Sequence, residues 1–251
     1  MKVGKLTLLI LGAATLLYSL STVSKPTIES QGLQYFGSGS NQQQIRLSSF
    51  EYVAQEQQRD QLPIGVAKDA MLTHPLGVGD QLPPHLFPLT KNSKPLNLSK
   101  AIHERPTVLI FYRGGWCPFC NLQMGQLQAI QGKLKSMGYQ MLAISADNPA
   151  HIRQSIKKHH LSYTLLSDHK MATSIAFGLA FKVSDVILQQ YKTYHINLDQ
   201  ASGDKSHILP VPAAYVFNRQ GRIVFAYSNP NYKVRVNPKL LLRAATVALK
   251  Q

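Results

Sequence analysis

From residue 86 onward, apolar and polar positions follow two periods, one typical of strands and one typical of helices. Residues 107–112 form a continuous apolar, β-branched run, which predicts a buried strand. A helical segment follows over 118–137 and ends at Gly138. We expect further strands at 86–89, 139–145, 163–166, 213–217 and 222–228, and further helices at 149–159, 171–177, 183–194 and 237–250.

The order of these elements predicts an α/β fold. Strands and helices alternate first, and the chain ends with two strands joined by the turn 218–221 and a last helix. This order is similar to the thioredoxin fold, a central mixed β-sheet flanked by helices. We expect the folded domain at residues 74–251, with the helix at 183–194 as an insertion. The polar, Gln-rich residues 25–73 predict a linker with an amphipathic helix near 47–58.

Residues 1–24 have the pattern of a bacterial secretory signal. Lys2 and Lys5 precede a short apolar stretch over residues 6–20, as a basic n-region precedes an h-region. No clean cleavage site of small residues follows, so an uncleaved membrane anchor is the alternative, although the stretch is short for a span. In both cases we expect the domain to be exported to the periplasm, either soluble or anchored to the inner membrane.

The chain is strongly basic, with 27 Lys and Arg residues against 12 Asp and Glu and a net charge of +15. Net charge bears on solubility and non-specific contacts rather than on the fold. A soluble basic protein is therefore the simplest interpretation, and anionic lipid headgroups or an acidic partner are the alternatives. We expect no nucleic-acid partner, because neither a recognition motif nor a stripe of basic and aromatic residues is present.

Two cysteines, Cys117 and Cys120, are the only ones in the chain. They follow the expected strand 107–112 and a tight turn at 113–115, and they begin the next expected helix. A thiolate at a helix N-terminus is stabilised by unpaired backbone N–H groups and by the helix dipole, which lowers its pKa. We expect a redox-active disulfide in which Cys117 is the exposed nucleophile and Cys120, one turn later, is the buried resolving cysteine.

Three other roles for the cysteines are weaker. A structural disulfide across two residues closes a very short loop and restricts the unfolded chain little. A zinc site needs a second ligand pair at suitable spacing, which the sequence lacks. A Cu(I)-binding module is chemically sensible because soft thiolates select Cu(I), but the sequence places no histidine as a third ligand. We expect no metal, flavin or nucleotide cofactor.

Three motifs occur in the order found in a known family: Val78-Gly79-Asp80, FYRGGWCPFC at 111–120 and LPVPAAYV at 209–216. In these motifs the chain resembles the peroxiredoxin-like branch of the alkyl hydroperoxide reductase C / thiol-specific antioxidant (AhpC/TSA) family, over about residues 75–250. The resemblance implies a thioredoxin fold and an antioxidant enzyme that reduces hydroperoxides through thiols. An external dithiol, similar to thioredoxin, would then reduce the cysteine pair.

Two positions depart from the family pattern. Typical members carry a Thr three residues before the peroxidatic Cys. Aligned on Phe111 and Tyr112, that Thr falls on Cys117 and the peroxidatic Cys on Cys120, which reverses the roles given above. The Arg with which the family binds peroxide aligns with Pro212, and we expect Arg113 to supply a substitute charge.

Other features resemble thioredoxins instead. Trp116 precedes the pair, and Pro118 lies within it, so we expect Trp116 to cover the cysteines and Pro118 to support them. Val211-Pro212 precedes a strand, where thioredoxins hold a cis-proline against the redox pair and bind substrate. The acid that thioredoxins bury near the first cysteine is replaced here by Phe111. Protein thiol–disulfide exchange is therefore the alternative to peroxide reduction.

Overall fold

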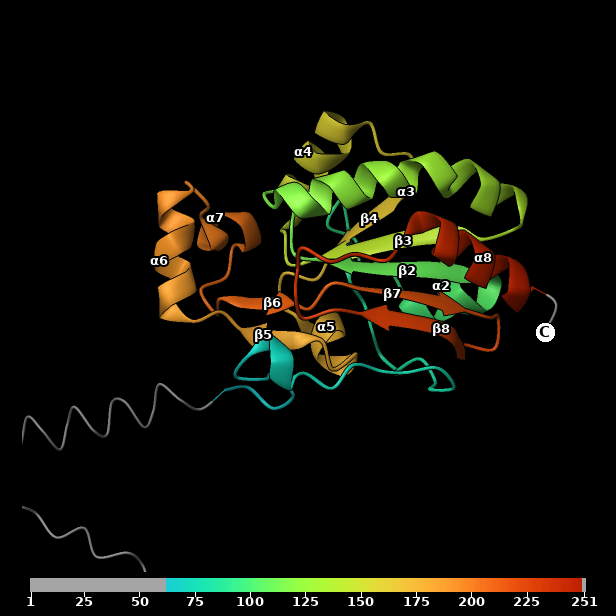
Figure 1. The fold of residues 1–251 in the computed structure, drawn as a ribbon, viewed down its shortest axis with the longest axis horizontal. Helices are drawn as coiled ribbons and strands as arrows, with labels where there is room; N and C mark the ends of the chain where they lie inside the picture. Colours follow the sequence, from blue (N-terminus) through green and yellow to red (C-terminus); the bar gives the residue numbers. More distant parts are fainter. Residues whose placement is uncertain (1–61, 250–251) are drawn as a thin grey trace, which may run out of the picture. The chain divides into compact units, whose positions relative to one another are not determined.

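The structure, a computed structural model, describes residues 62–249 (Figure 1). At its centre is a six-stranded sheet in the order β1-β4-β3-β2-β7-β8. The strands are β1 (Leu89–Thr90), β2 (Thr107–Tyr112), β3 (Gln140–Ser145), β4 (Thr164–Ser167), β7 (Ala213–Phe217) and β8 (Ile223–Ser228). Strands β2, β3 and β4 run parallel, whereas β1, β7 and β8 are antiparallel to their neighbours, so the expected mixed sheet is confirmed.

Helices cover both faces of this sheet (Figure 1). They are α2 (Leu98–Glu104), α3 (Pro118–Ser136), α4 (Pro149–His159), α5 (Ala172–Ala176), α6 (Asp185–Thr193), α7 (Leu198–Ser202) and α8 (Pro238–Ala248). Side chains alternate along β2, as the two-residue period of a strand requires. Val108, Ile110 and Tyr112 pack with α3, α4 and α8, whereas Leu109 and Phe111 pack with α2. All six residues of β2 are buried, in agreement with the uninterrupted apolar run.

Most of the expected elements are present with small shifts at their ends, and the α/β fold is confirmed. The first expected strand, 86–89, was placed too early, since β1 is the two-residue strand Leu89–Thr90. The short helices α2 and α7 were not expected. Asn148 caps α4, because its side chain accepts hydrogen bonds from two backbone N–H groups of the first turn.

The insertion is larger than the single expected helix. Strands β5 (Ala180–Lys182) and β6 (Ile208–Pro210) form a separate antiparallel pair, and α6 and α7 lie between them in sequence. Figure 1 shows α6 and α7 at the end of the molecule where α3 begins. The insertion therefore stands beside the two cysteines, which lie at the start of α3.

The folded part begins before residue 74. Ala67 forms a parallel bridge to Phe181, Val66 is buried, and the short 3₁₀-helix η1 (Ala70–Leu72) follows. The expected signal or anchor at 1–24, most of the expected linker and its helix near 47–58 lie outside the described residues. Within residues 62–249, no helix is both long and apolar enough to span a bilayer.

Candidate active site

A tight turn brings the cysteines to the carboxyl end of β2. Cys117 is the N-cap of α3, its backbone N–H donates to Gly114 O at 3.2 Å, and Pro118 occupies the first turn, where a missing N–H costs nothing. The turn needs both glycines. A Cβ on Gly114 would lie 2.6 Å from Asp147 Oδ1 and collide with the Trp116 ring, and a Cβ on Gly115 would collide with Ser155.

Both cysteines are free thiols inside the protein. Cys117 is 1% exposed and Cys120 is 0% exposed. The expectation that Cys117 would be exposed is therefore wrong, since it packs with Tyr112 and Met124 in the apolar cluster under α3. A position at the helix start does not expose a side chain when neighbouring segments fold over it.

The two thiols differ in acidity. Hydrogen bonding from the Cys120 thiol, helped by the positive charges of Arg113 and Arg235, lowers the pKa of Cys117 to about 6 against the effect of its own burial. Burial raises the pKa of Cys120, and the neighbouring Cys117 raises it further. Near neutral pH, Cys117 is therefore the thiolate and Cys120 the protonated thiol.

Arg113 supplies a buried positive charge at the site. It is 3% exposed, and its guanidinium carbon lies 4.0 Å from the centre of the Tyr232 ring, 4.9 Å from that of Trp116 and 5.4 Å from that of Tyr191. These distances are typical of cation–π contacts. Burial lowers the pKa of Arg113 from its usual value, and the Cys117 thiolate opposes that change. The geometry suits the substitute charge expected from the sequence.

A second cation, Arg235, was missed by sequence reasoning. Its Nη2 donates to Cys120 Sγ at 3.3 Å, its Nη1 to Gln123 Oε1 at 3.1 Å and its Nε to Tyr232 O at 2.8 Å. Arg235 lies in the connection between β8 and α8, 115 residues after Cys120. Nothing in the local sequence marks it, because only the packing of α8 against α3 brings this segment to the cysteines.

A buried acid, Asp147, was also missed as a site residue. It follows β3, is 1% exposed, and its Oδ2 accepts a hydrogen bond from Gly115 N at 2.7 Å. Burial raises the pKa of Asp147 to about 7, and the charge of Cys120 adds to this increase. The sequence suggested that the acid position of thioredoxins is vacant at Phe111. The fold places an acid from another strand beside the turn 113–115 that precedes the cysteines, here named the redox turn after the function expected of the pair.

The remaining expected site residues lie as follows. Trp116 is half-buried between Arg113 and Tyr191, with 5.5 Å between the Trp116 and Tyr191 ring centres. Pro118 is exposed at the start of α3.

The expected cis-proline is wrong, since residues 62–249 contain no cis peptide bond. Val211 is fully buried in the cluster on the opposite face of the sheet from the cysteines. Its backbone N–H donates to Leu179 O at 2.8 Å, so it is already paired within the fold. Pro212 O accepts from Asn229 N at 3.2 Å, which ties this segment to the end of β8.

The described residues offer no cluster of three or more His, Cys, Asp or Glu side chains arranged to hold a metal ion.

Comparison with known proteins identifies the family. The model described as "AhpC/TSA family" matches residues 78–226. The chain belongs to the AhpC/TSA family. It is a peroxiredoxin-like member of the thioredoxin superfamily, and hence a thiol-dependent oxidoreductase, which confirms the family expected from the motifs.

Curated relatives agree with this assignment, and solved structures share the fold. The putative peroxiredoxin bcp of Haemophilus influenzae is 32% identical over 106 residues, which cover 42% of this chain and 67% of that protein. The chloroplastic peroxiredoxin Q of Triticum aestivum is 26% identical over 148 residues, 59% of this chain and 58% of that protein. Peroxidoxin BcpB of Mycobacterium tuberculosis shares the fold, with a TM-score of 0.53 at 15% identity over 68% of this chain and 97% of that one.

Proposed function

We propose that this AhpC/TSA member reduces hydroperoxides through the Cys117–Cys120 pair. The observation that carries the proposal is the thiol of Cys117, which has a pKa of about 6 and lies beside the buried cation Arg113. A thiolate that is ionised at neutral pH and shielded from water is the nucleophile that peroxide reduction needs. The relatives named as peroxiredoxins support the same chemistry.

The reaction has three steps. The Cys117 thiolate attacks the terminal oxygen of the hydroperoxide, the O–O bond breaks, and the leaving alkoxide takes a proton to become an alcohol. Cys117 is then a sulfenic acid. The Cys120 thiolate attacks Cys117 Sγ, the S–O bond breaks, and the departing hydroxide takes a proton to become water. An external dithiol returns two electrons and two protons to the disulfide by thiol–disulfide exchange.

Burial of the pair favours a small oxidant. With Cys117 only 1% exposed, a hydroperoxide reaches its sulfur more readily than a folded protein disulfide does. The trans bond before Pro212 and the internal pairing of Val211 also weigh against the thioredoxin-like alternative, in which this segment binds an extended substrate chain.

Trapping the sulfenic acid tests this function and the roles of the two cysteines. Full-length Cys117→Ser and Cys120→Ser proteins would each be treated with hydrogen peroxide and a dimedone probe, and the adduct located by mass spectrometry. We expect an adduct on Cys117 in Cys120→Ser and none on Cys120 in Cys117→Ser. An adduct confined to Cys120 would support the reversed roles of the family alignment, and no adduct in either variant would contradict peroxide reduction.

A further inference from the structure

The resolving step requires a proton acceptor for Cys120. Cys120 is 0% exposed, and it must lose its proton before its sulfur attacks Cys117. Arg235 donates to Cys120 Sγ and so stabilises the thiolate, but an arginine does not accept a proton. A second group near the redox turn has to receive the proton. This question rests on the proposed function, in which Cys120 resolves.

Asp147 is the buried acid whose carboxylate is only partly satisfied. Its Oδ2 accepts from Gly115 N, whereas its Oδ1 has no hydrogen-bond partner among the described residues. Asp168, the other strongly buried carboxylate, differs because its two oxygens accept three hydrogen bonds, one from Thr173 and two from Ser174. The carboxylate of Asp168 is thus paired with the first turn of α5, while Oδ1 of Asp147 is left available for another partner.

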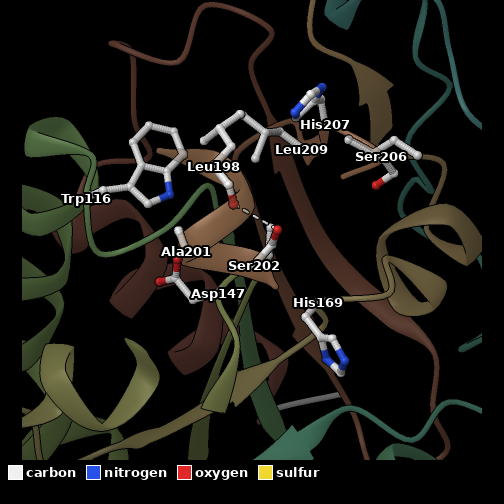
Figure 2. Close-up of a pocket in the computed structure, with 11 residues that line it drawn as sticks. Trp116, Asp147, His169, Leu198, Ala201, Ser202, Ser206, His207 and Leu209 are labelled. Atoms are coloured by element: carbon white, nitrogen blue, oxygen red, sulfur yellow. Dashed lines mark hydrogen bonds between the residues drawn. The ribbon is translucent and has the colours of Figure 1, made fainter. Parts of the chain in front are cut away.

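Asp147 lines a small cavity between the redox turn and the insertion. The cavity has a volume of about 10 Å³, which is room for one water molecule. Figure 2 shows Trp116 and Asp147 on one side of it and Ser206 and His207 on the other. The cavity therefore joins the turn that carries the cysteines to the segment that follows α7.

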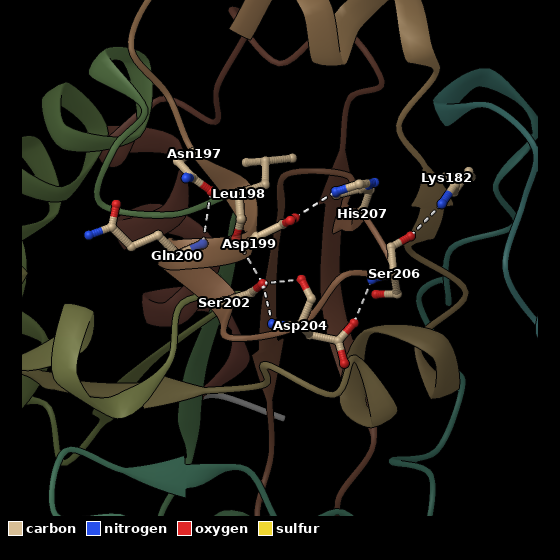
Figure 3. A network of polar contacts seen from close by, with 9 residues as sticks. All are labelled: Lys182, Asn197, Leu198, Asp199, Gln200, Ser202, Asp204, Ser206 and His207. Carbon is tan, nitrogen blue, oxygen red and sulfur yellow. Dashed lines mark hydrogen bonds and ion pairs between the residues drawn. The ribbon is translucent and has the colours of Figure 1, made fainter. Parts of the chain in front are cut away.

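His207 links this cavity to solvent. Its Nε2 lies 2.6 Å from Asp199 Oδ1, and the two side chains are 27% and 44% exposed. Figure 3 shows the pair within a polar network that also contains Ser202 and Asp204. His207 and Asp199 both line a larger hollow of about 600 Å³ between α6 and α7, so His207 borders both the small cavity and the larger one.

We propose that Asp147 accepts the proton of Cys120, and that a water in the small cavity and the His207–Asp199 pair connect this carboxylate to solvent. In the resolving step the S–H bond of Cys120 breaks and Oδ1 of Asp147 takes the proton. The Cys120 thiolate then forms the S–S bond, and the hydroxide released from Cys117 takes a proton to become water. The insertion thus supplies the outer part of a proton path to a buried redox pair.

The surroundings of Asp147 suit this role. The titratable groups that face it are Cys120 on α3, Tyr112 on β2, and His169 and His207 across the cavity. Burial raises its pKa to about 7, so it holds a proton part of the time near neutral pH. A carboxyl group with a pKa near the working pH both accepts and returns a proton efficiently.

The test isolates the attack of Cys120 from the attack on peroxide. Reduced full-length protein would be mixed with methyl methanethiosulfonate, a small reagent that leaves a methyl disulfide on Cys117. Cys120 then displaces methanethiol, and rapid quenching with mass spectrometry follows the internal disulfide over a range of pH. The variants are Asp147→Asn and His207→Gln. Asp204→Asn is the matched control, because Asp204 pairs with Lys170 in the same network without lining the cavity.

In the wild-type protein and in Asp204→Asn, we expect disulfide closure to accelerate as the pH rises through about 7, where Asp147 ionises. Asp147→Asn should close about 100-fold more slowly, the scale of a lost general base. Its rate should rise only above the ordinary thiol pKa of about 8.5, while formation of the methyl disulfide is unchanged. His207→Gln should slow closure less, by about threefold to tenfold, because it removes only the outer part of the path.

Closure in Asp147→Asn at the wild-type rate with the wild-type pH profile would overturn the proposal. If that variant does not fold, the wild-type protein alone decides: a closure rate that rises only above a pH of about 8.5 overturns the proposal equally. Disulfide closure in His207→Gln at the wild-type rate would contradict the role of the His207–Asp199 pair in the path to solvent. Reaction with hydrogen peroxide, measured separately on the same proteins, reports on the proposed function, so slow peroxide reduction with normal Asp147-dependent closure would contradict that function alone.

Discussion

Cys117 and Arg113 are four residues apart, and both are buried. A thiol removed from water ordinarily becomes less acidic, yet hydrogen bonding from Cys120 and the nearby guanidinium groups reverse this and bring the pKa of Cys117 to about 6. The rings of Trp116, Tyr191 and Tyr232 surround its guanidinium at cation–π distances. The low pKa of Cys117 therefore depends first on the hydrogen bond from Cys120 and second on the buried charge of Arg113.

Replacing Arg113 with Gln should raise the pKa of Cys117. Without the cation, burial acts with less opposition, and we expect the titration midpoint to move upward by about one pH unit or more. The absorbance of the thiolate, followed against pH in the Cys120→Ser background, measures this midpoint directly. Arg219→Gln, in the exposed turn between β7 and β8, is the control. An unchanged midpoint in Arg113→Gln would show that Arg113 does not support the thiolate.

For single residues, the sequence predicted the relations between positions that lie close together in the chain. The C-x-x-C pair, its place at a helix start and the charge of Arg113 lie within eight residues of one another, so spacing alone indicates their relation. Arg235 and Asp147 reach the cysteines only through the packing of distant segments, and no local pattern marks them. The cis bond expected at Pro212 came from analogy with thioredoxins, and the backbone here is trans.

Among the elements, the turn between β2 and α3 is the most constrained. Gly114 lies against the ring of Trp116 and the carboxylate of Asp147, and nothing larger than hydrogen fits there. The same chain carries a contrasting glycine, Gly125, which lies on the exposed side of α3 with open space around its Cα. These two positions separate the effect of steric contact from that of backbone entropy.

We therefore predict opposite effects from the same substitution. Gly114→Ala should lower the free energy of unfolding by about 1–3 kcal/mol, because a methyl group there overpacks the turn. Gly125→Ala should raise it by roughly 0.5–1 kcal/mol, because alanine favours the helix. Denaturant unfolding of both variants measures the difference. A Gly114→Ala protein as stable as the wild type would mean that the turn adapts and that its glycines are not required.

Long, strongly patterned elements were predicted well, and short ones were not. The buried run of β2 and the long helix α3 carry enough residues for their periods to be recognised. By contrast, α2 and α7 have seven and five residues, and β5 and β6 three each. Such segments are held by tertiary contacts and by Asn caps such as Asn97 and Asn197 rather than by their own pattern.

For the molecule as a whole, Asp147 links the site to stability. Its pKa is about 7 in the fold, against about 4 in an unfolded chain. Between these values the native protein holds a proton that the unfolded chain has released, so the free energy of unfolding should decrease as the pH rises from about 4 to about 7. Below this window, Asp147 is protonated in both states, and its full contribution to the free energy of unfolding is present.

Asp147→Asn should remove this part of the pH dependence. Denaturant unfolding of the wild type and the variant over the same pH series gives the difference between them, in which the other titrating groups cancel. We expect the variant to gain stability relative to the wild type as the pH rises through the window. A difference that does not change with pH would show that Asp147 is not held protonated by its burial.

The most direct test of the central claim is the rate at which the reduced full-length protein reacts with hydrogen peroxide. Trp116, the only tryptophan in the chain, lies beside the cysteine pair and provides a stopped-flow fluorescence signal. We predict oxidation at least about 100-fold faster than that of a free thiol, on the scale of a preorganised electrostatic contribution. The fast phase should be kept in Cys120→Ser and lost in Cys117→Ser. A rate like that of a free thiol in the wild type would contradict the peroxidase function.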